Sequence, residues 1–214
     1  MTPILSADTA ITLVGGGPVA APDLHAAVAL APLVVAADGG LLRACEHGQK
    51  VAHVIGDMDS APRIDGPQYH EIPEQMTTDL DKCLYSTCAP FYIGVGFLGG
   101  RLDHELAACH ALVKAPAQHV VLLGERDLCF LAPRDFRLDL PVGTRLSLFP
   151  MGPVRGESDG LEYPLAGLDF APDGMIGTSN RVTGPLHLRF DAPKMLLLLP
   201  KAHLTQVVRS CFLS

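Results

Sequence analysis

Short apolar runs alternate with helix-like stretches up to about residue 132, and this alternation constrains the fold more than any other feature of the chain. The apolar runs predict strands at residues 11–14, 33–37, 53–55, 91–95 and 120–123. Helical spacing predicts helices at residues 23–30, 41–47, 79–88 and 102–114, and in the last of these Leu102, Leu106, Cys109 and Val113 share one face. Such alternation is typical of a mostly parallel sheet that is covered by helices.

The pattern changes after about Ala132. Residues 186–191 alternate strictly between apolar and polar side chains, and residues 145–149 nearly do. Residues 195–199 and 206–213 are predicted as further strands, and we expect no amphipathic helix in this part of the chain. These patterns predict a small all-β unit, a sandwich or a barrel, and divide the chain into two domains at residues 1–132 and 133–214.

Composition and charge limit the classes of partner. The 214 residues are 48% hydrophobic and 18% charged, and the net charge of −7 comes without basic runs, which argues against nonspecific binding to nucleic acids or acidic membranes. No stretch approaches the roughly 18 apolar residues of a membrane span. No lysine or arginine precedes Arg43, so we expect no ordinary signal peptide. The six cysteines show no zinc spacing, which favours reduced thiols in a cytoplasmic protein.

Three pairs of acidic residues share the spacing acid-x-acid, and each pair lies where a strand is expected to end or a helix to begin. Because the carboxyl ends of parallel strands form the ligand crevice of an open α/β sheet, we expect these side chains to converge. The pairs are Asp57 with Asp59, Asp79 with Asp81, and Asp103 with Glu105.

The first pair belongs to a short acidic loop, Gly56-Asp57-Met58-Asp59-Ser60, directly after a predicted buried strand. Carboxylates so close repel each other, and hard oxygen ligands without histidine or cysteine suit Mg²⁺. A turn followed by a helix cap explains the same residues without a ligand, since Asp and Ser serve both purposes. The loop alone leaves both interpretations open.

The second pair opens a predicted helix. Thr78 and Asp81 loosely fit a capping box, and Asp79 would then lie at the positive end of the helix with Lys82 three residues later. Such a carboxylate and ammonium can hold a metal and a phosphate, but a surface ion pair at a capped helix is the alternative. Near the third pair, Gly99 and Gly100 permit close backbone approach, and the Arg101 guanidinium suits phosphate oxygens. A turn between strand and helix with an ion pair between Arg101 and Asp103 is the alternative.

Two further glycine-rich loops follow predicted strands, at residues 15–17 and at Asp38-Gly39-Gly40. The first fits neither a dinucleotide-binding nor a P-loop pattern, and a tight turn explains it without a ligand. The second again ends a strand with an acid and glycines. Taken together, the glycine- and acid-bearing loops at several strand ends predict a site for a polyphosphate with Mg²⁺.

The order of these motifs resembles that of the thiamine pyrophosphokinase family over nearly the whole chain. The segment 160–165, Gly-Leu-Glu-Tyr-Pro-Leu, is similar to that family's glycine-leucine-x-aromatic-x-leucine segment, and Ser179-Asn180 resembles its thiamine-contacting segment. Some members place a tryptophan after that segment, whereas this chain has Arg181 there and contains no tryptophan. The remaining motifs are Ala37-Asp38-Gly39-Gly40, Gly56-Asp57-x-Asp59-Ser60, Gln75-x-x-Thr78-Asp79-x-x-Lys82 and Gly99-Gly100-Arg101-x-Asp103-His104.

The resemblance implies a Rossmann-like α/β catalytic domain with a mostly parallel sheet, followed by an all-β sandwich that binds thiamine, in a cytoplasmic homodimer. It implies that ATP and thiamine react to give AMP and thiamine diphosphate. By the same resemblance, Mg²⁺ and the phosphates are held by Asp57, Asp59 and Asp79; phosphate oxygens are contacted by Lys82, Arg101 and Ser60; the site is lined by Asp38, Gly39, Gln75, Thr78 and Asp103; and thiamine is reached by Ser179 and Asn180.

Other functions stay open on the sequence alone. A related pyrophosphokinase acting on another hydroxymethyl substrate, such as a pterin, would share the ATP half of the site. A non-catalytic thiamine or nucleotide sensor could keep the fold, although the presence of Asp57, Asp59, Asp79 and Lys82 argues against it. A metal-dependent glycosyltransferase would leave residues 99–103 without a role.

Overall fold

The computed structural model describes residues 3–213 and shows a mixed α/β protein with two compact units, Met1–Glu125 and Arg126–Ser214. The mixed α/β class expected from the sequence is therefore confirmed. The contacts divide the chain before β9, because β9 pairs with β15 of the second unit. The predicted boundary lies after β9, at residue 132. Within the described residues no helix is long and apolar enough to cross a membrane.

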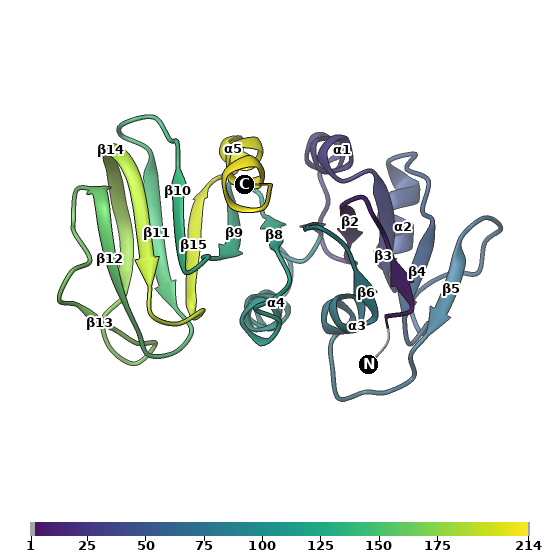
Figure 1. The fold of residues 1–214 in the computed structure, drawn as a ribbon. Coiled ribbons are helices and arrows are strands. Elements are labelled where there is room, and N and C mark those ends of the chain that lie inside the picture. Colours follow the sequence, from purple (N-terminus) through teal and green to yellow (C-terminus); the bar gives the residue numbers. More distant parts are fainter. Residues whose placement is uncertain (1–2, 214) are drawn as a thin grey trace. The chain divides into compact units, whose positions relative to one another are not determined.

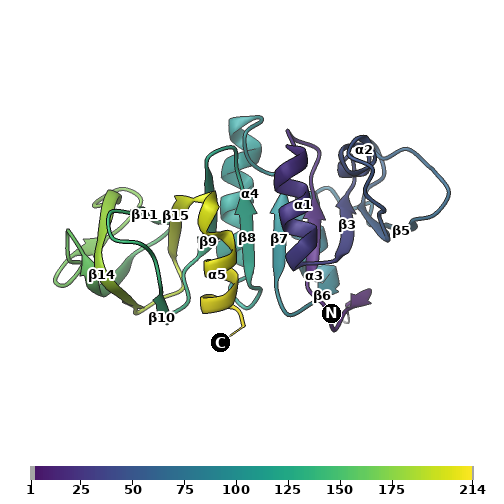
Figure 2. The ribbon, with the colours of Figure 1, turned by 90° about the horizontal axis from the view of Figure 1, so that it is seen from above.

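The first unit contains six parallel strands in the order β8-β7-β2-β3-β4-β5. Figure 1 shows α1 on one side of this sheet and α3 and α4 on the other, and Figure 2 shows the same strands from above. The elements are β2 (Ile11–Val14), α1 (Ala21–Leu30), β3 (Leu33–Ala37), α2 (Gly40–Glu46), β4 (His53–Gly56), β5 (Gln68–Glu71), α3 (Asp79–Ser86), β7 (Tyr92–Val95), α4 (Leu102–Lys114) and β8 (Val120–Leu123), with a small pair formed by β1 (Leu5–Ser6) and β6 (Thr87–Cys88).

The strand order reverses between β2 and β7. From β2 the chain proceeds through β3 and β4 toward the edge strand β5, and from β7 it proceeds to β8 in the opposite direction. The loops that leave these two neighbouring strands therefore separate, and the crevice at such a switch point is where open α/β sheets bind ligands. We therefore expect a ligand site next to the segments that follow Val14 and Val95.

Several details of the first unit differ from the sequence prediction. The helix predicted at residues 79–88 ends at Ser86, and Thr87–Cys88 forms β6. β5 was not predicted, because its residues are polar and half-exposed at the edge of the sheet and carry no apolar pattern. In α4, Leu102 and Leu106 are 70% and 60% exposed, and the helix instead buries Ala108, Ala111 and Leu112. The helix therefore buries small alanine side chains, which the spacing of the larger residues alone did not indicate.

The second unit consists mainly of antiparallel strands. The long strand β14 (Gly177–Phe190) pairs with β11 through its first part and with β12 and β10 through its second part. The other elements are β9 (Asp127–Leu131), β10 (Asp135–Leu138), β11 (Arg145–Pro150), β12 (Val154–Leu161), β13 (Asp169–Phe170), β15 (Met195–Pro200), a 3₁₀ turn at Lys201–His203 and α5 (Leu204–Cys211).

The strand predicted at residues 206–213 is wrong, and the second unit is therefore not all-β. The segment forms α5, an amphipathic helix that buries Leu204, Val207 and Val208 and packs near β10. These positions follow the spacing i, i+3, i+4 of a helical face. The adjacent valines suggested a strand because β-branched residues favour extended structure, and burial of the helical face overrode that preference.

A histidine pair joins the edge strand β5 of the first unit to its neighbour β4 and makes the stability of the unit depend on pH. His53 on β4 and His70 on β5 stack, with 3.0 Å between Nδ1 of the first and Nε2 of the second. Burial lowers the pKa of both imidazoles, and the neighbouring ring lowers the pKa of His53 further. The folded pair is therefore protonated at lower pH than the same residues in the unfolded chain.

We expect the free energy of unfolding to be highest above about pH 6.5, the unfolded pKa of histidine, and to fall as the pH drops through the lowered folded values. The replacement His70→Gln removes one titrating ring and should flatten this fall. Urea unfolding between about pH 7.5 and about pH 5 measures it. Identical pH profiles for the wild type and the variant would show that the pair contributes nothing.

Candidate active site

A cavity of about 1040 Å³ lies in the first unit, at the carboxyl ends of its strands. Its wall includes the glycine loop after β2, Asp38 and Gly39 after β3, Asp57 and Ser60 after β4, and Gly96 with Phe97 after β7. The segments that the strand order singles out therefore form one wall. The cavity is large enough for a ligand the size of a nucleotide.

Two glycines shape this wall by allowing close packing. A methyl group at Gly40, the first residue of α2, would lie 1.8 Å from the carbonyl oxygen of Val14 at the end of β2. A methyl group at Gly56 would lie 2.7 Å from Cβ of Asp38. Both positions require glycine because the backbone of one element touches its neighbour. Gly40 and Gly56, which both belong to the sequence motifs, therefore allow neighbouring segments to pack closely.

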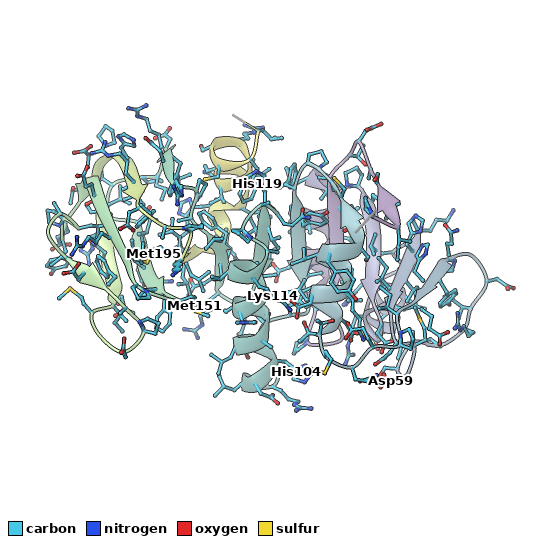
Figure 3. The ribbon with its side chains drawn as sticks, turned by 60° about the horizontal axis from the view of Figure 1, so that its bottom comes forward. Asp59, His104, Lys114, His119, Met151 and Met195 are labelled. Atoms are coloured by element: carbon cyan, nitrogen blue, oxygen red, sulfur yellow. The ribbon has the colours of Figure 1, made fainter. Side chains whose placement is uncertain are left out.

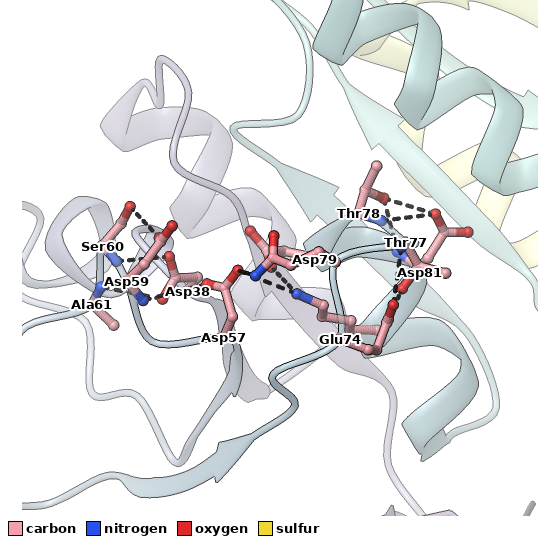
Figure 4. Close-up of polar contacts among 12 residues, drawn as sticks. Asp38, Asp57, Asp59, Ser60, Ala61, Glu74, Thr77, Thr78, Asp79 and Asp81 are labelled. Carbon is pink, nitrogen blue, oxygen red and sulfur yellow. Dashed lines mark hydrogen bonds and ion pairs between the residues drawn. The ribbon is translucent and has the colours of Figure 1, made fainter.

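Three carboxylates gather at the cavity, in the segments that directly follow the adjacent strands β3 and β4. One oxygen from each of Asp38, Asp57 and Asp59 lies within 4.8 Å of the others. Asp38 is buried, has a positive φ of 42°, and accepts hydrogen bonds from the backbone N–H groups of Ser60 and Ala61, both at 3.1 Å (Figure 4). Parallel pairing of β3 with β4 brings these strand ends together.

The electrostatics of this cluster fit a cation. Burial raises the pKa of Asp38, and a hydrogen bond with the carboxyl group of Asp59 raises it further. Two carboxylates in such contact repel each other when both are ionised, and a divalent cation relieves that repulsion. A donor set made of oxygen atoms, with no histidine or cysteine, fits Mg²⁺.

Lys82 lies on the other side of Asp57. Its side chain is almost fully buried, and its Nζ lies 3.6 Å from Oδ2 of Asp57 and 3.4 Å from Oδ1 of Asp79. Burial opposes the charge of the ammonium group, but the two carboxylates outweigh it and raise the pKa of Lys82. Lys82 is therefore a fixed positive charge at the cavity wall.

The two partners of Lys82 differ in their protonation behaviour. A hydrogen bond from Nε2 of Gln75, at 2.7 Å, is the main cause that lowers the pKa of Asp57, and Lys82 adds to it. Burial raises the pKa of Asp79, an effect that the charge of Lys82 opposes and the nearby Asp38 reinforces. Asp79 is not among the three clustered carboxylates.

Helix α3 holds Asp79 and Lys82 in place through a capping box. The Thr78 hydroxyl accepts a hydrogen bond from the backbone N–H of Asp81, and the Asp81 carboxylate accepts one from the backbone N–H of Thr78. Asp81 also pairs with Lys114 of α4 at 3.1 Å. The predicted capping box is confirmed, and it points the N-terminus of α3 and Asp79 toward the cavity.

A second cation, Arg101, also lines the cavity, directly before α4. Its guanidinium forms two hydrogen bonds with Asp103, with Nη2 2.6 Å and Nε 3.1 Å from the carboxylate oxygens. Both side chains are exposed and line the cavity. Figure 3 shows His104, the next residue of α4, at the same edge of the view as Asp59. Arg101 keeps free N–H groups for an anion in the cavity.

Most of the residues singled out in the sequence meet at this one cavity. Asp59 does not line it but belongs to the carboxylate cluster beside it. Ser179 and Asn180 lie in the second unit. The cavity is lined by Asp38, Gly39, Asp57, Ser60, Gln75, Thr78, Asp79, Lys82, Arg101 and Asp103.

The sequence analysis missed several lining residues on α2 and α4. Arg43 lines the cavity, donates through Nε to the carbonyl oxygen of Gly16 at 3.2 Å and pairs with Glu46, so α2 is fastened to the glycine loop. The available clue was that α2 begins directly after β3. Its first turns must then lie at the strand ends. The other missed residues include Leu42, Thr77, Phe97, Ala107 and Ala108.

In the second unit, Asn180 organises a neighbouring aromatic residue. Its buried side-chain oxygen accepts hydrogen bonds from the backbone N–H groups of Tyr163 and Arg181, and its Nδ2 donates to the carbonyl oxygen of Tyr163 at 2.8 Å. The Tyr163 side chain itself is 62% exposed. Ser179 has a positive φ of 62° and is exposed next to them. Asn180 therefore fixes the backbone that presents the tyrosine ring.

Comparison with known proteins matches both units to one family. A family model described as the thiamin pyrophosphokinase catalytic domain matches residues 24–122, and one described as the thiamin pyrophosphokinase vitamin B1 binding domain matches residues 135–195. Thiamine pyrophosphokinase 1 of Arabidopsis thaliana is 30% identical over 153 residues, which cover 60% of this chain and 57% of that protein. Thiamine pyrophosphokinase 2 of Oryza sativa subsp. japonica is 31% identical with the same shares.

The chain thus spans little more than half the length of these curated relatives. Among solved structures, thiamin pyrophosphokinase from Candida albicans superposes with a TM-score of 0.75 at 14% identity, covering 92% of each chain, and supports the fold. A protein from Lactobacillus plantarum superposes with a TM-score of 0.72 at 25% identity, covering 90% of this chain and 99% of that one.

Proposed function

Because this chain belongs to the thiamin pyrophosphokinase family, we propose that it transfers the pyrophosphoryl group of ATP to the hydroxyl group of thiamine, giving thiamine diphosphate and AMP. The observation that carries the proposal is the convergence of the acidic residues, Lys82 and Arg101 at one cavity within the region matched to the catalytic domain. Pyrophosphoryl transfer requires mainly positioning and neutralisation of charge, and these residues supply both.

The carboxylate cluster is the proposed magnesium site. Asp38, Asp57 and Asp59 would hold the ion, with Asp38 in the place that the sequence analysis gave to Asp79. Bound there, Mg²⁺ neutralises negative charge on the phosphate oxygens. The proximity of the three carboxylates and the absence of softer ligands support this assignment.

The remaining charged residues act on the phosphates and on the acceptor. Lys82 and Arg101 would contact oxygens of the migrating group as negative charge shifts toward the leaving AMP. Asp79, outside the carboxylate cluster and beside Lys82, is the group that we assign to accept the proton of the thiamine hydroxyl. Ser60 would orient phosphate oxygens, and Gln75 would orient Asp57. The site would also be lined by Gly39, Thr78 and Asp103.

We further propose that the first unit is a Rossmann-like ATP domain, within residues 1–132, and that residues 133–214 form the thiamine domain. β14 pairs with β11 in one part of its length and with β10 and β12 in another, and this division supports a β-sandwich. The helix α5 packs near β10 of this domain. The family also suggests a cytoplasmic homodimer in which Ser179 and Asn180 reach thiamine. Sedimentation that finds only monomer would contradict the dimer.

The choice of acceptor substrate is testable against the main alternative. Thiamine and a hydroxymethyl pterin are each supplied with ATP and Mg²⁺, and AMP is quantified. We expect AMP with thiamine only. AMP with the pterin only would instead assign the chain to another pyrophosphokinase.

Tyr163 is the proposed aromatic partner of thiamine in this chain, which contains no tryptophan. A tyrosine face attracts a cationic ring such as the thiazolium of thiamine, and the bonds from Asn180 hold the tyrosine in place. We expect Tyr163→Leu to raise the KM for thiamine about tenfold, an energy of the order of a desolvated cation–π contact. Tyr163→Phe keeps the aromatic face and should change it little.

The KM for ATP should stay unchanged in both variants. The variant Phe149→Leu, at another partly exposed aromatic residue of the second unit, is the matched control. Equal KM values for thiamine in Tyr163→Leu and Tyr163→Phe would remove Tyr163 from the thiamine site.

A further inference from the structure

One carboxylate organises the loop between β5 and α3, which carries three residues of the cavity wall: Gln75, Thr77 and Thr78. The side chain of Glu74 accepts hydrogen bonds from the backbone N–H of Met76 at 2.7 Å and from the backbone N–H of Thr77 at 3.2 Å. It also accepts from the Thr77 hydroxyl (Figure 4) and from the Tyr85 hydroxyl at 3.1 Å. Four donors thus converge on Glu74.

These bonds close the loop and fasten it to the neighbouring helix. Met76 and Thr77 follow Glu74 by two and three residues, so their bonds fold the backbone around its side chain. Tyr85 lies on α3, so its bond ties the loop to the helix that carries Asp79 and Lys82. The donors lower the pKa of Glu74, so it is ionised and a strong acceptor at neutral pH.

The residue that depends on this arrangement is Gln75. Its side chain is exposed, yet its Nε2 lies 2.7 Å from Oδ2 of Asp57 and is the largest influence on the pKa of that carboxylate. An exposed glutamine holds one rotamer only if its backbone is fixed, because the side chain otherwise loses rotamer entropy on bonding. Glu74 fixes the backbone that follows Gln75 through its bonds to the N–H groups of Met76 and Thr77.

Glu74 itself does not line the cavity. Its two oxygens are already occupied by four donors, which leaves it little capacity to bind a ligand or a metal directly. Its effect on the site must therefore pass through the residues that it holds.

We propose that Glu74 is a positioning residue of the active site, which acts through Gln75 to orient Asp57 for binding of magnesium and ATP. The inference rests on the proposed function, because it assigns Asp57 to the ATP site. It adds a residue outside the cavity whose loss changes the chemistry inside it.

A double-mutant cycle tests this proposal. Glu74→Ala, Gln75→Ala and the double variant are compared with the wild type for kcat and for KM of ATP at saturating Mg²⁺. We expect each single replacement to lower kcat/KM about tenfold, the effect of one lost hydrogen bond to a charged group. The double variant should be no worse than Gln75→Ala, because the proposal routes the effect of Glu74 on the site through Gln75 and not through Thr77 or Tyr85.

Two additional variants separate positioning from general damage. Glu74→Gln keeps the shape but has one acceptor oxygen and should fall between the wild type and Glu74→Ala. Glu71→Ala, at an exposed glutamate paired with Arg63 at the end of β5, should leave kcat/KM within about twofold, as is usual for surface positions. Urea unfolding of every variant reports whether the fold is retained.

Additive losses in the double variant, or a Glu74→Gln variant with wild-type kcat/KM, would overturn the proposal. The same cycle is read in parallel from calorimetric binding of ATP with Mg²⁺. If the wild type binds ATP with Mg²⁺ but transfers nothing to thiamine, the proposed function fails, while the binding cycle still decides the role of Glu74.

Discussion

The replacement Asp57→Asn is expected to lower kcat about 10²-fold or more, the scale of a lost charge-stabilising group. Asp57 is the one carboxylate shared by both halves of the site: it belongs to the cluster with Asp38 and Asp59, and it lies 3.6 Å from Nζ of Lys82. Asparagine keeps the shape but removes the charge. The cluster loses a ligand for the cation, and Lys82 loses one of its two partners.

The measurement is release of AMP from ATP with thiamine and saturating Mg²⁺. Asp65→Asn, at an exposed aspartate between β4 and β5, is the matched control and should retain wild-type kcat. If Asp57→Asn works at a near-normal rate, and Asp79→Asn does as well, the assignment of the catalytic carboxylates is wrong.

The replacement Lys82→Met is expected to lower kcat by about 10²- to 10³-fold. Methionine has a similar length and fits the buried position, so it removes the charge with little change in packing. The phosphate oxygens lose a fixed cation, while Asp57 and Asp79 face each other across the vacated position without neutralisation. Repulsion between the substrate and these carboxylates then adds to the loss.

The loss should fall mainly on kcat if Lys82 acts on the charge that develops during transfer, since interactions present only in the transition state affect kcat. Lys50→Met, at an exposed lysine after α2, tests for a general effect of removing a positive charge and should be neutral. A Lys82→Met enzyme with unchanged kcat and a raised KM for ATP would reduce Lys82 to a ground-state binding residue.

The sequence predicted the part of the fold that depends on local apolar patterns. The five expected strands of the first unit are present within about one residue because they are fully buried runs, which carry a clear pattern. The polar edge strand β5 and the helix α5 were not predicted. In both, long-range packing decides the conformation: β5 by pairing with β4, and α5 by burial of Leu204, Val207 and Val208.

The sequence predicted which residues belong to the candidate site better than it predicted which of them lie next to each other. The sequence placed Asp79 with Asp57 and Asp59, whereas the structure clusters Asp38 with that pair and sets Asp79 beside Lys82. Motif order cannot measure distances between strand ends. The pairing of β3 with β4 determines which carboxylates meet, and that pairing is a long-range property.

The supporting residues were the least predictable part. Glu74 and Asn180 act through hydrogen bonds to backbone groups near them, and such roles depend on the final path of the chain. No residue type or spacing marks Glu74 in advance, and the motif that contains Asn180 predicted a contact with thiamine and not this supporting role. Gln75 and Tyr163 also belong to motifs, and only the structure relates the members of each pair.

One measurement tests the central claim most directly: quantification of AMP and thiamine diphosphate after incubation of the protein with ATP, Mg²⁺ and thiamine. We expect one AMP for each thiamine diphosphate, and neither product when thiamine or Mg²⁺ is left out. Formation of ADP with thiamine monophosphate, or AMP release that does not depend on thiamine, would contradict the assigned pyrophosphoryl transfer.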